Sequence, residues 1–239
     1  LFNIPIKRNE YFSFNVYSGS PPGITVFFIP LESAGGSSTS TSSLDSITIA
    51  NMIAGAGGDG GCSFDFPDGL TGSYITEQLC DNNQTVTPYT VPSGKTLYIT
   101  NAYTESFINI ELDNGNSAQI LAATSTGGNQ SLNNPIVIAQ GKTITGFNNS
   151  NYYSVINGIL IENSQIEPIN TGGIYTVPLG KRLYITNIFG GYVNIDNKRI
   201  NGSGYLFDNH ILVDADQVVD ASGSTIFNGY LVDDNYFAG

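Results

Sequence analysis

The sequence contains no tryptophan, one histidine, one methionine and two cysteines among its 239 residues. Positive charge is also scarce, because 8 Lys and Arg residues stand against 20 Asp and Glu residues, for a formal net charge of −12. So negative a chain repels polyanions, which argues against binding to nucleic acids or to anionic membrane surfaces. One histidine and two cysteines also fall short of the ligand sets that transition-metal sites use.

Long hydrophobic runs are missing as well. Crossing a bilayer takes about 20 apolar residues, and the nearest approach, residues 24–31, contains a proline, so we expect no membrane insertion. Charged residues make up only 12% of the chain, but hydrophobic residues make up 40% and include 13 Phe and 14 Tyr, which is enough to build a core. The sequence opens on Leu1 rather than on Met, from which we expect a processed N-terminus.

The two cysteines, Cys62 and Cys80, lie among Gly, Ser, Asp and Asn residues, without a nearby third ligand for zinc. We expect them to form a disulfide that closes a loop of fewer than 20 residues. Such a bond would stabilise the fold by about 3 kcal/mol and would indicate an extracellular or particle setting. Two unpaired, buried thiols are the alternative.

An internal repeat is the most informative feature. Residues 89–101, YTVPSGKTLYITN, recur as residues 175–187, YTVPLGKRLYITN, with 11 of 13 positions identical. The closing segments, residues 155–162 and 226–233, match in the same order and share an Asn-Gly pair. These matches predict two copies of one domain, at residues 87–165 and 173–239, joined by a short polar linker at residues 163–173.

The pattern within each copy predicts β-structure. Leu97 and Ile99 alternate with Thr96, Tyr98 and Thr100, which is typical of a strand with one buried face. Short segments of β-branched and aromatic residues, separated by Gly and Asn, continue to the end of each copy without a helical period. We therefore predict an all-β protein with two tandem small sandwiches of jelly-roll or Greek-key connection.

Residues 1–86 contain no third copy of the repeat. They hold two strand candidates, at residues 11–17 and 24–29, a Ser/Thr/Gly tract at residues 33–43, and a segment at residues 44–56 that suits a helix or a strand equally. We expect this part to be a β-rich segment for anchoring and assembly, with a Ser/Gly loop, whose first 30 residues add a strand to a partner.

Few residues suggest a binding site. Tyr98 and Tyr184 occupy matched positions on the polar face of their strands, where they are candidates for glycan stacking or subunit contact, or simply good strand formers. His210 is expected in a surface turn. A further set of carboxylates offers oxygen ligands for calcium, although solvated turn acids are the favoured interpretation: Asp214, Asp216 and Asp220.

Catalytic signals are weak. The sequence contains no G-x-S-x-G elbow, and its acids fall mainly in expected turns. The chain has enough Asp and Glu residues to supply a glycosidase-type pair of carboxylates, so that alternative stays open, although the sequence contains no tryptophan to bind a sugar ring beside it. We therefore expect no catalytic residue and no resident cofactor.

The repeat resembles a known kind of domain. The pattern Tyr-Thr-Val-Pro-x-Gly-Lys-x-Leu-x-Ile-Thr, followed by Pro-Ile-Val-Ile-Ala-x-Gly at residues 135–141 and a final Asn-Gly-x-Leu strand, looks like the small jelly-roll head domains of phage virion proteins and of Bacteroidetes surface proteins. The resemblance covers residues 87–239, and in the second copy Asp214-Ala215-Asp216 replaces Ala139-Gln140-Gly141. It implies assembly as trimers or larger rings, recognition of surfaces, and no catalysis.

From these features we expect a non-enzymatic structural or recognition protein at a virion surface: a capsid-associated, spike or receptor-binding component. Its partners would be further copies of the chain, with a trimer favoured, other virion or surface proteins, and a glycan receptor. Two alternatives are a secreted bacterial adhesin or glycan-binding module, and an extracellular filament subunit joined by strand addition. Each places the protein on a virion surface or outside the cell.

Overall fold

The computed structural model describes residues 64–81, 85–122, 128–147, 153–200 and 210–237. The regular secondary structure in these ranges consists of β-strands alone, and all of the paired strands run antiparallel. No helix among the described residues is long and apolar enough to span a membrane. The segments expected at residues 11–17, 24–29, 33–43 and 44–56 lie outside the described residues.

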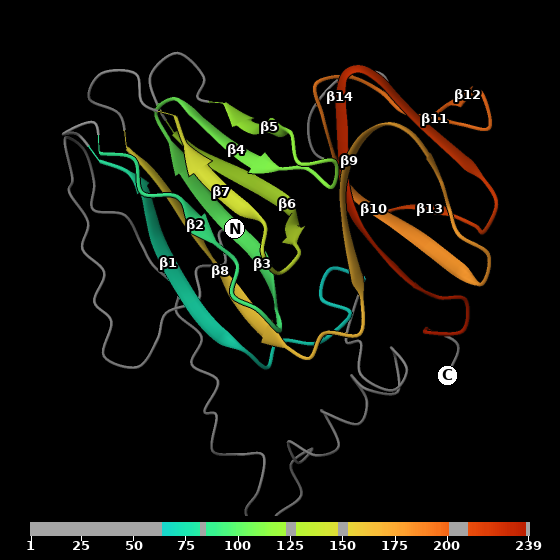
Figure 1. Ribbon diagram of the computed structural model, residues 1–239, viewed down its shortest axis with the longest axis horizontal. Helices are drawn as coiled ribbons and strands as arrows, with labels where there is room; N and C mark the ends of the chain where they lie inside the picture. The colour runs from blue at the N-terminus through green and yellow to red at the C-terminus, as the bar shows by residue number, and fades with distance from the viewer. Residues whose placement is uncertain (1–63, 82–84, 123–127, 148–152, 201–209, 238–239) are drawn as a thin grey trace, which may run out of the picture.

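The first sandwich consists of two four-stranded sheets, which lie on the left of Figure 1. One sheet has the order β1(Ser73–Cys80), β8(Ser154–Glu162), β3(Lys95–Thr104), β6(Gly128–Ile138). The other has the order β2(Tyr89–Thr90), β7(Thr143–Gly146), β4(Phe107–Glu111), β5(Ser117–Ala122). The orders 1-8-3-6 and 2-7-4-5 describe a double Greek key, which is the jelly roll.

The second sandwich repeats this topology with six strands in place of eight. Its elements are β9(Glu167–Thr176), β10(Lys181–Phe189), β11(Asn194–Ile195), β12(Lys198–Arg199), β13(Ile211–Val213) and β14(Val218–Asp233). The first half of β9 pairs with the second half of β14 as β1 pairs with β8, and the remaining halves pair as β2 pairs with β7. Gly173 and Gly223 lie near the point where the register shifts, with φ of 80° and 76°. Both strands therefore pass from one layer to the other.

The register supports the repeat residue by residue. A bulge interrupts β3 between Ile99 and Asn101 and β10 between Ile185 and Asn187. Matched ion pairs join Lys95 to Glu162 at 3.0 Å and Lys181 to Asp233 at 2.9 Å. The prediction of an all-β chain with two tandem jelly-roll sandwiches is therefore confirmed, whereas its N-terminal segment lies outside the described residues except for residues 64–81 and 85–86.

The structure shifts two predicted boundaries. β1 lies before residue 87 but pairs along β8, so it belongs to the first sandwich. The predicted linker at residues 163–173 contains the first seven residues of β9, which pair with β14. The sequence did not reveal this equivalence because Ser73-Tyr74-Ile75-Thr76 and Glu167-Pro168-Ile169-Asn170 share only the isoleucine.

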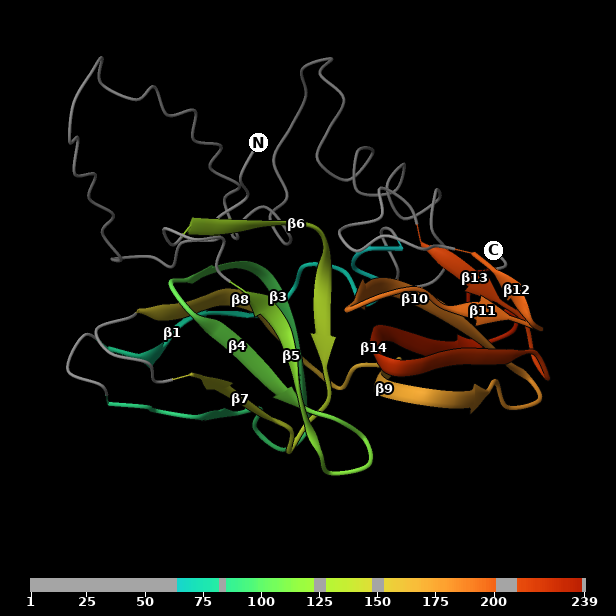
Figure 2. The same cartoon turned by 90° about the horizontal axis from the view of Figure 1, so that it is seen from above.

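Each sandwich has its own apolar core. Leu97, Ile99 and Ile136 are fully buried in the first, and Leu183 and Ile185 in the second. A third cluster draws residues from both sandwiches: Tyr98, Val137, Ile159, Ile161, Ile166, Tyr184, Tyr230 and Val232. The two halves of the repeat thus share a buried contact, and Figure 2 shows the end of β6 directed toward β10 and β14.

Candidate functional site: the junction of the two sandwiches

The junction, meaning the contact of β6 and the β4–β5 turn with β9, β10 and β14, begins at a strand edge. β6 is the end strand of its sheet, and Val137 pairs with Tyr98 on its inner side. On its outer side, Val137 N donates to Asn228 Oδ1 at 3.0 Å, and Asn228 Nδ2 donates to Val137 O at 2.7 Å. The side-chain amide of Asn228 thus pairs with the peptide groups of Val137 as a neighbouring strand would, and the edge is closed.

Asn228 is held in place from its own sandwich. Thr186 Oγ1 donates to Asn228 Oδ1 at 2.9 Å, and Asn228 Nδ2 donates to Asn170 Oδ1 at 2.7 Å. Asn170 Nδ2 adds a second bond to Val137 O at 3.2 Å. Both hydrogens and both lone pairs of the Asn228 amide are therefore used, and a buried amide with all of its groups paired strongly favours one arrangement.

Two further asparagines connect the sandwiches in opposite directions. Asn134 Nδ2 of the first sandwich donates to Thr186 O at 2.9 Å, and Asn187 Nδ2 of the second donates to Pro135 O at 3.0 Å. All four of these residues are buried. The junction is thus specified by directional hydrogen bonds as well as by apolar area.

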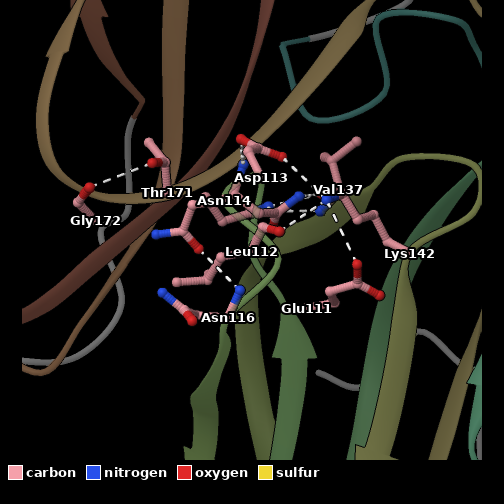
Figure 3. Close-up of polar contacts among 11 residues, drawn as sticks. Glu111, Leu112, Asp113, Asn114, Asn116, Val137, Lys142, Thr171 and Gly172 are labelled. Carbon is pink, nitrogen blue, oxygen red and sulfur yellow. Dashed lines mark hydrogen bonds and ion pairs between the residues drawn. The ribbon is translucent and has the colours of Figure 1, made fainter.

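The β4–β5 turn reaches across to β9 (Figure 3). Asp113 N donates to Asn170 O at 2.9 Å, and Asn170 N donates to Asp113 Oδ2 at 2.9 Å. Lys142 Nζ donates to Leu112 O at 2.7 Å and lies 3.9 Å from Glu111 Oε1 and 4.0 Å from Asp113 Oδ1. The turn is therefore anchored on both sides, by its own sandwich and by the second one.

The electrostatics of this turn follow from its position. Burial raises the pKa of the Asp113 carboxyl, the hydrogen bond from Asn170 N–H and the Lys142 ammonium lower it, and nearby Glu167 raises it further. The carboxylate thus accepts a backbone hydrogen bond at the junction, and a single lysine is its nearest cation. These contacts hold the backbone of the turn against β9.

An aromatic strap, residues 64–68, crosses the outer faces of both sandwiches. The Phe64 ring stacks on Tyr184 with centroids 5.3 Å apart, and the Phe66 ring lies 5.7 Å from that of Tyr98. Tyr184 also stacks on its cross-strand partner Tyr230 at 5.3 Å with a 5° interplanar angle. Such pairs contribute about 0.5–1.5 kcal/mol each beyond their buried area.

Hydrogen bonds fasten the strap at both ends. Tyr230 OH donates to Phe64 O at 2.6 Å, and Tyr98 OH donates to Asp68 Oδ2 at 2.7 Å. Asp68 Oδ1 also accepts from Gln165 N at 3.0 Å, in the connection between the two sandwiches. Burial and the adjacent Asp68 carboxylate raise the pKa of Tyr98, so its hydroxyl stays a donor. The residues that join residues 1–63 to the sandwiches are therefore firmly docked.

The prediction that Tyr98 and Tyr184 offer exposed contact surfaces is wrong. The two side chains are 0% and 2% exposed. Strand alternation correctly placed them opposite the sandwich cores, but the strap and the junction cover that face. Neither ring is available to stack on a glycan in this structure.

The expected disulfide is not formed in this structure. Cys80 is a buried, free thiol whose Sγ lies 3.7 Å from Asp81 O, and Cys62 lies outside the described residues. A Cβ added at Gly146 of β7 would lie 3.0 Å from the Cβ of Cys80, so β1 and β7 pass close to each other at this point. Burial and the adjacent Asp81 raise the pKa of the thiol, although a backbone hydrogen bond opposes this.

The proposed calcium ligands do not form a cluster. Asp214 Oδ1 accepts from Arg182 Nε at 2.9 Å, Asp216 has φ of 67° in the turn where the first copy has Gly141, and Asp220 pairs with Asn194 within the sheet. Across the described ranges, no group of three or more His, Cys, Asp or Glu residues could hold a metal ion. The turn interpretation fits Asp214 and Asp216, whereas Asp220 is a strand residue.

The side chain of His210 is largely covered rather than exposed in a surface turn. Its side chain is 7% exposed, beside the ring of Phe64, and its Nε2 lies 3.5 Å from Asp65 Oδ1. Among the described residues, no group forms a hydrogen bond with Nε2. Burial lowers the pKa of His210, and the Asp65 carboxylate opposes this shift.

A pH dependence follows. Because the folded pKa of His210 lies below its ordinary value of 6.5, the unfolded chain binds the proton more tightly. The stability contributed by the neutral imidazole is fully present above about pH 6.5 and is lost as the pH falls toward the folded pKa. We expect the melting temperature to fall between pH 7 and pH 5 by more in the wild type than in His210→Asn. Equal slopes in thermal scans of the two proteins would contradict this role.

A small hollow lies beside the strap. Its volume is about 150 Å³, below the roughly 300–1,000 Å³ typical of small-molecule sites. It is lined by Asp68, Thr71, Ile161, Glu162, Asn163, Gln165 and Tyr236. Its size suits water or a small ion better than a cofactor.

The important residues that sequence reasoning missed are the junction asparagines, above all Asn170 and Asn228. Asparagine is depleted in strands, so the Asn-Gly pair that recurs at residues 157–158 and 228–229 inside predicted strands was an available signal. It identified special positions without showing what they contact.

Fold and junction together define the class: an all-β protein of two jelly rolls fused edge to face. No family model matches the chain, and no curated protein matches it. One similar solved structure is a conserved protein of unknown function, PA5104, from Pseudomonas aeruginosa PAO1, at 8% sequence identity and a TM-score of 0.24. The match covers 67% of this chain and 89% of that one, and so distant a likeness carries no argument.

Proposed function

We propose that this chain is a non-enzymatic structural or recognition protein of a virion surface, which assembles through contacts between β-sandwiches. The junction is the observation that carries the proposal. Buried hydrogen bonds join the side-chain amides of Asn228 and Asn170 in the second jelly roll to the peptide groups of Val137 in the first. They hold the two jelly rolls as one preformed pair. The jelly roll is a common architecture of capsid and lectin domains.

The distribution of exposed apolar side chains also supports assembly. Ile174 and Leu212 are 74% and 53% exposed, and both lie on the second sandwich. Exposed apolar side chains of this size are suited to burial in a contact with another protein. The strap adds a docked route by which residues 1–63 reach the sandwiches, in keeping with their expected anchoring role.

The structure bears on the two alternatives, the glycan-binding adhesin and the filament subunit, in different ways. A glycan-binding adhesin of this fold would need a site other than Tyr98 and Tyr184, since both are buried. A filament subunit joined by strand addition through residues 1–30 depends on a segment outside the described residues. Both stay alternatives to the virion assignment.

Mass spectrometry and immunogold labelling of purified particles from the source culture test the assignment. We expect the chain in many copies per particle, with label on the outer surface. Its absence from particles, together with recovery from the culture medium or the cell surface, would overturn the virion assignment in favour of the adhesin or filament. Binding on a carbohydrate array then separates the adhesin from the filament.

A further inference from the structure

The repeat places the same strand edge in two different environments. Val137 of β6 and Leu212 of β13 are equivalent, because they pair with the matched tyrosines Tyr98 and Tyr184. The Val137 side chain is 0% exposed, since the second sandwich covers it. The Leu212 side chain is 53% exposed. The edge that the junction closes in the first sandwich is thus open to solvent at Leu212 in the second.

β13 has the properties of a strand that accepts a neighbour. It is the end strand in the order β12-β11-β14-β10-β13, and its three residues, Ile211–Val213, are all apolar. An apolar edge of this kind is a template for a further contact unless charge or a covering element blocks it. Within this chain, the equivalent edge binds the amides of Asn170 and Asn228.

The surface that receives such an edge is repeated as well. Asn228, Thr186 and Asn187 of the second sandwich correspond to Asn157, Thr100 and Asn101 of the first, and Asn170 corresponds to Thr76. Three of the four residue types are identical, and the fourth exchanges an amide for a hydroxyl.

The internal hydrogen bonds of the receiving surface are kept too. Asn157 Nδ2 donates to Thr76 Oγ1 at 2.9 Å, as Asn228 Nδ2 donates to Asn170 Oδ1 at 2.7 Å. Thr76 itself is exposed. The first sandwich therefore carries a second version of the surface that holds β6, in which Asn157 is 7% exposed and Thr76 lies exposed at the rim.

We propose that the β13 edge of one chain docks on the Thr76–Asn157 surface of a second copy, head to tail, with Leu212 in the role of Val137. In the docked state, Asn157 Nδ2 exchanges its 3.1 Å bond to Ile75 O for one to the incoming Leu212 O. This inference rests on the proposed assembly function and names the contact that it uses. A head-to-tail contact closes into a ring or grows into a filament according to its rotation.

Two variants and a control test this contact in the purified full chain. Leu212→Lys places a charge on the β13 edge that docks, and Thr76→Arg places a large charged side chain on the Thr76–Asn157 surface that receives it. Leu179→Lys is the matched control, because Leu179 is 81% exposed in the β9–β10 turn, outside both surfaces. Native mass spectrometry and light scattering measure the mass, and circular dichroism checks that each variant folds.

We expect the wild type and Leu179→Lys to assemble, and Leu212→Lys and Thr76→Arg each to stay at the 25.5 kDa of one chain. A mixture of the last two should give a dimer of one copy each that grows no further, because each variant keeps the surface that the other lacks.

Three results would overturn the inference in distinguishable ways. A wild type that stays monomeric at 100 µM would remove the proposed assembly as well as this contact. Assembly that survives in both single variants would remove only this contact. If Thr76→Arg forms dimers by itself, and the mixture contains no dimer of Thr76→Arg with Leu212→Lys, the contact is a pairing of two β13 edges and not a head-to-tail contact.

Discussion

Replacing Asn228 by alanine is expected to lower the free energy of unfolding by about 3–5 kcal/mol, because the change leaves the buried N–H and C=O of Val137 without their main partner. Asn170 Nδ2 would still reach Val137 O at 3.2 Å, but Val137 N would lose its acceptor. Thr186 and Asn170 would each lose a bond to the same amide.

Chemical denaturation followed by circular dichroism measures this loss. Asn116→Ala is the control, since Asn116 is exposed in the β4–β5 turn and its replacement should change stability by no more than about 0.5 kcal/mol. We also expect Asn228→Ala to separate one transition into two, because the sandwiches would no longer unfold together. A stability equal to that of Asn116→Ala would show that the junction amide contributes little.

Gly229→Ala is expected to destabilise the second sandwich by about 3 kcal/mol or more, because a well-packed site accommodates an added methyl only by moving backbone. A Cβ on Gly229 would lie 2.2 Å from Tyr184 O and 3.0 Å from Ile185 Cα, at the bulge of β10. Neither contact can be relieved by rotating a side chain, so the paired strands β10 and β14 must separate.

The repeat supplies a replicate and a control for this prediction. Gly158→Ala should behave similarly in the first sandwich, since its Cβ would lie 2.3 Å from Tyr98 O. Gly115→Ala introduces the same methyl at φ of 80° with no atom within 4 Å, so it should cost only the backbone strain of about 1–2 kcal/mol. Thermal and urea unfolding of the three variants rank these losses. The steric argument fails if Gly115→Ala is the most damaging.

Sequence reasoning predicted much of each sandwich. Alternation placed Leu97 and Ile99 toward a core, and both are fully buried there. The near-identity of residues 89–101 and 175–187 predicted two copies, and the matched bulges and ion pairs confirm that they fold in the same register. These predictions succeeded because a strand's period of two and a turn's Pro-x-Gly depend on neighbours in sequence.

The candidate site was predicted poorly, and the reason is physical. Tyr98 and Tyr184 were correctly placed opposite the cores, but alternation cannot say whether that face meets water or a strap from residues 64–68. His210 was expected at the surface because a neighbouring Asp and Asn suggest a turn, whereas Phe64 and Tyr230 enclose it. Asn228 gained its role from Val137, which lies 91 positions earlier in the chain.

The amino-acid sequence by itself determined an all-β chain, its two copies, their apolar faces and the turns between their strands, because each of these follows from local pattern and backbone preference. The tertiary structure alone decided which faces and edges are covered. That choice pairs groups far apart in the chain, such as the Asn228 amide with the Val137 peptide and Phe64 with Tyr184. It depends on three-dimensional complementarity, and it left the β13 edge at Leu212 exposed while its twin in β6 was closed.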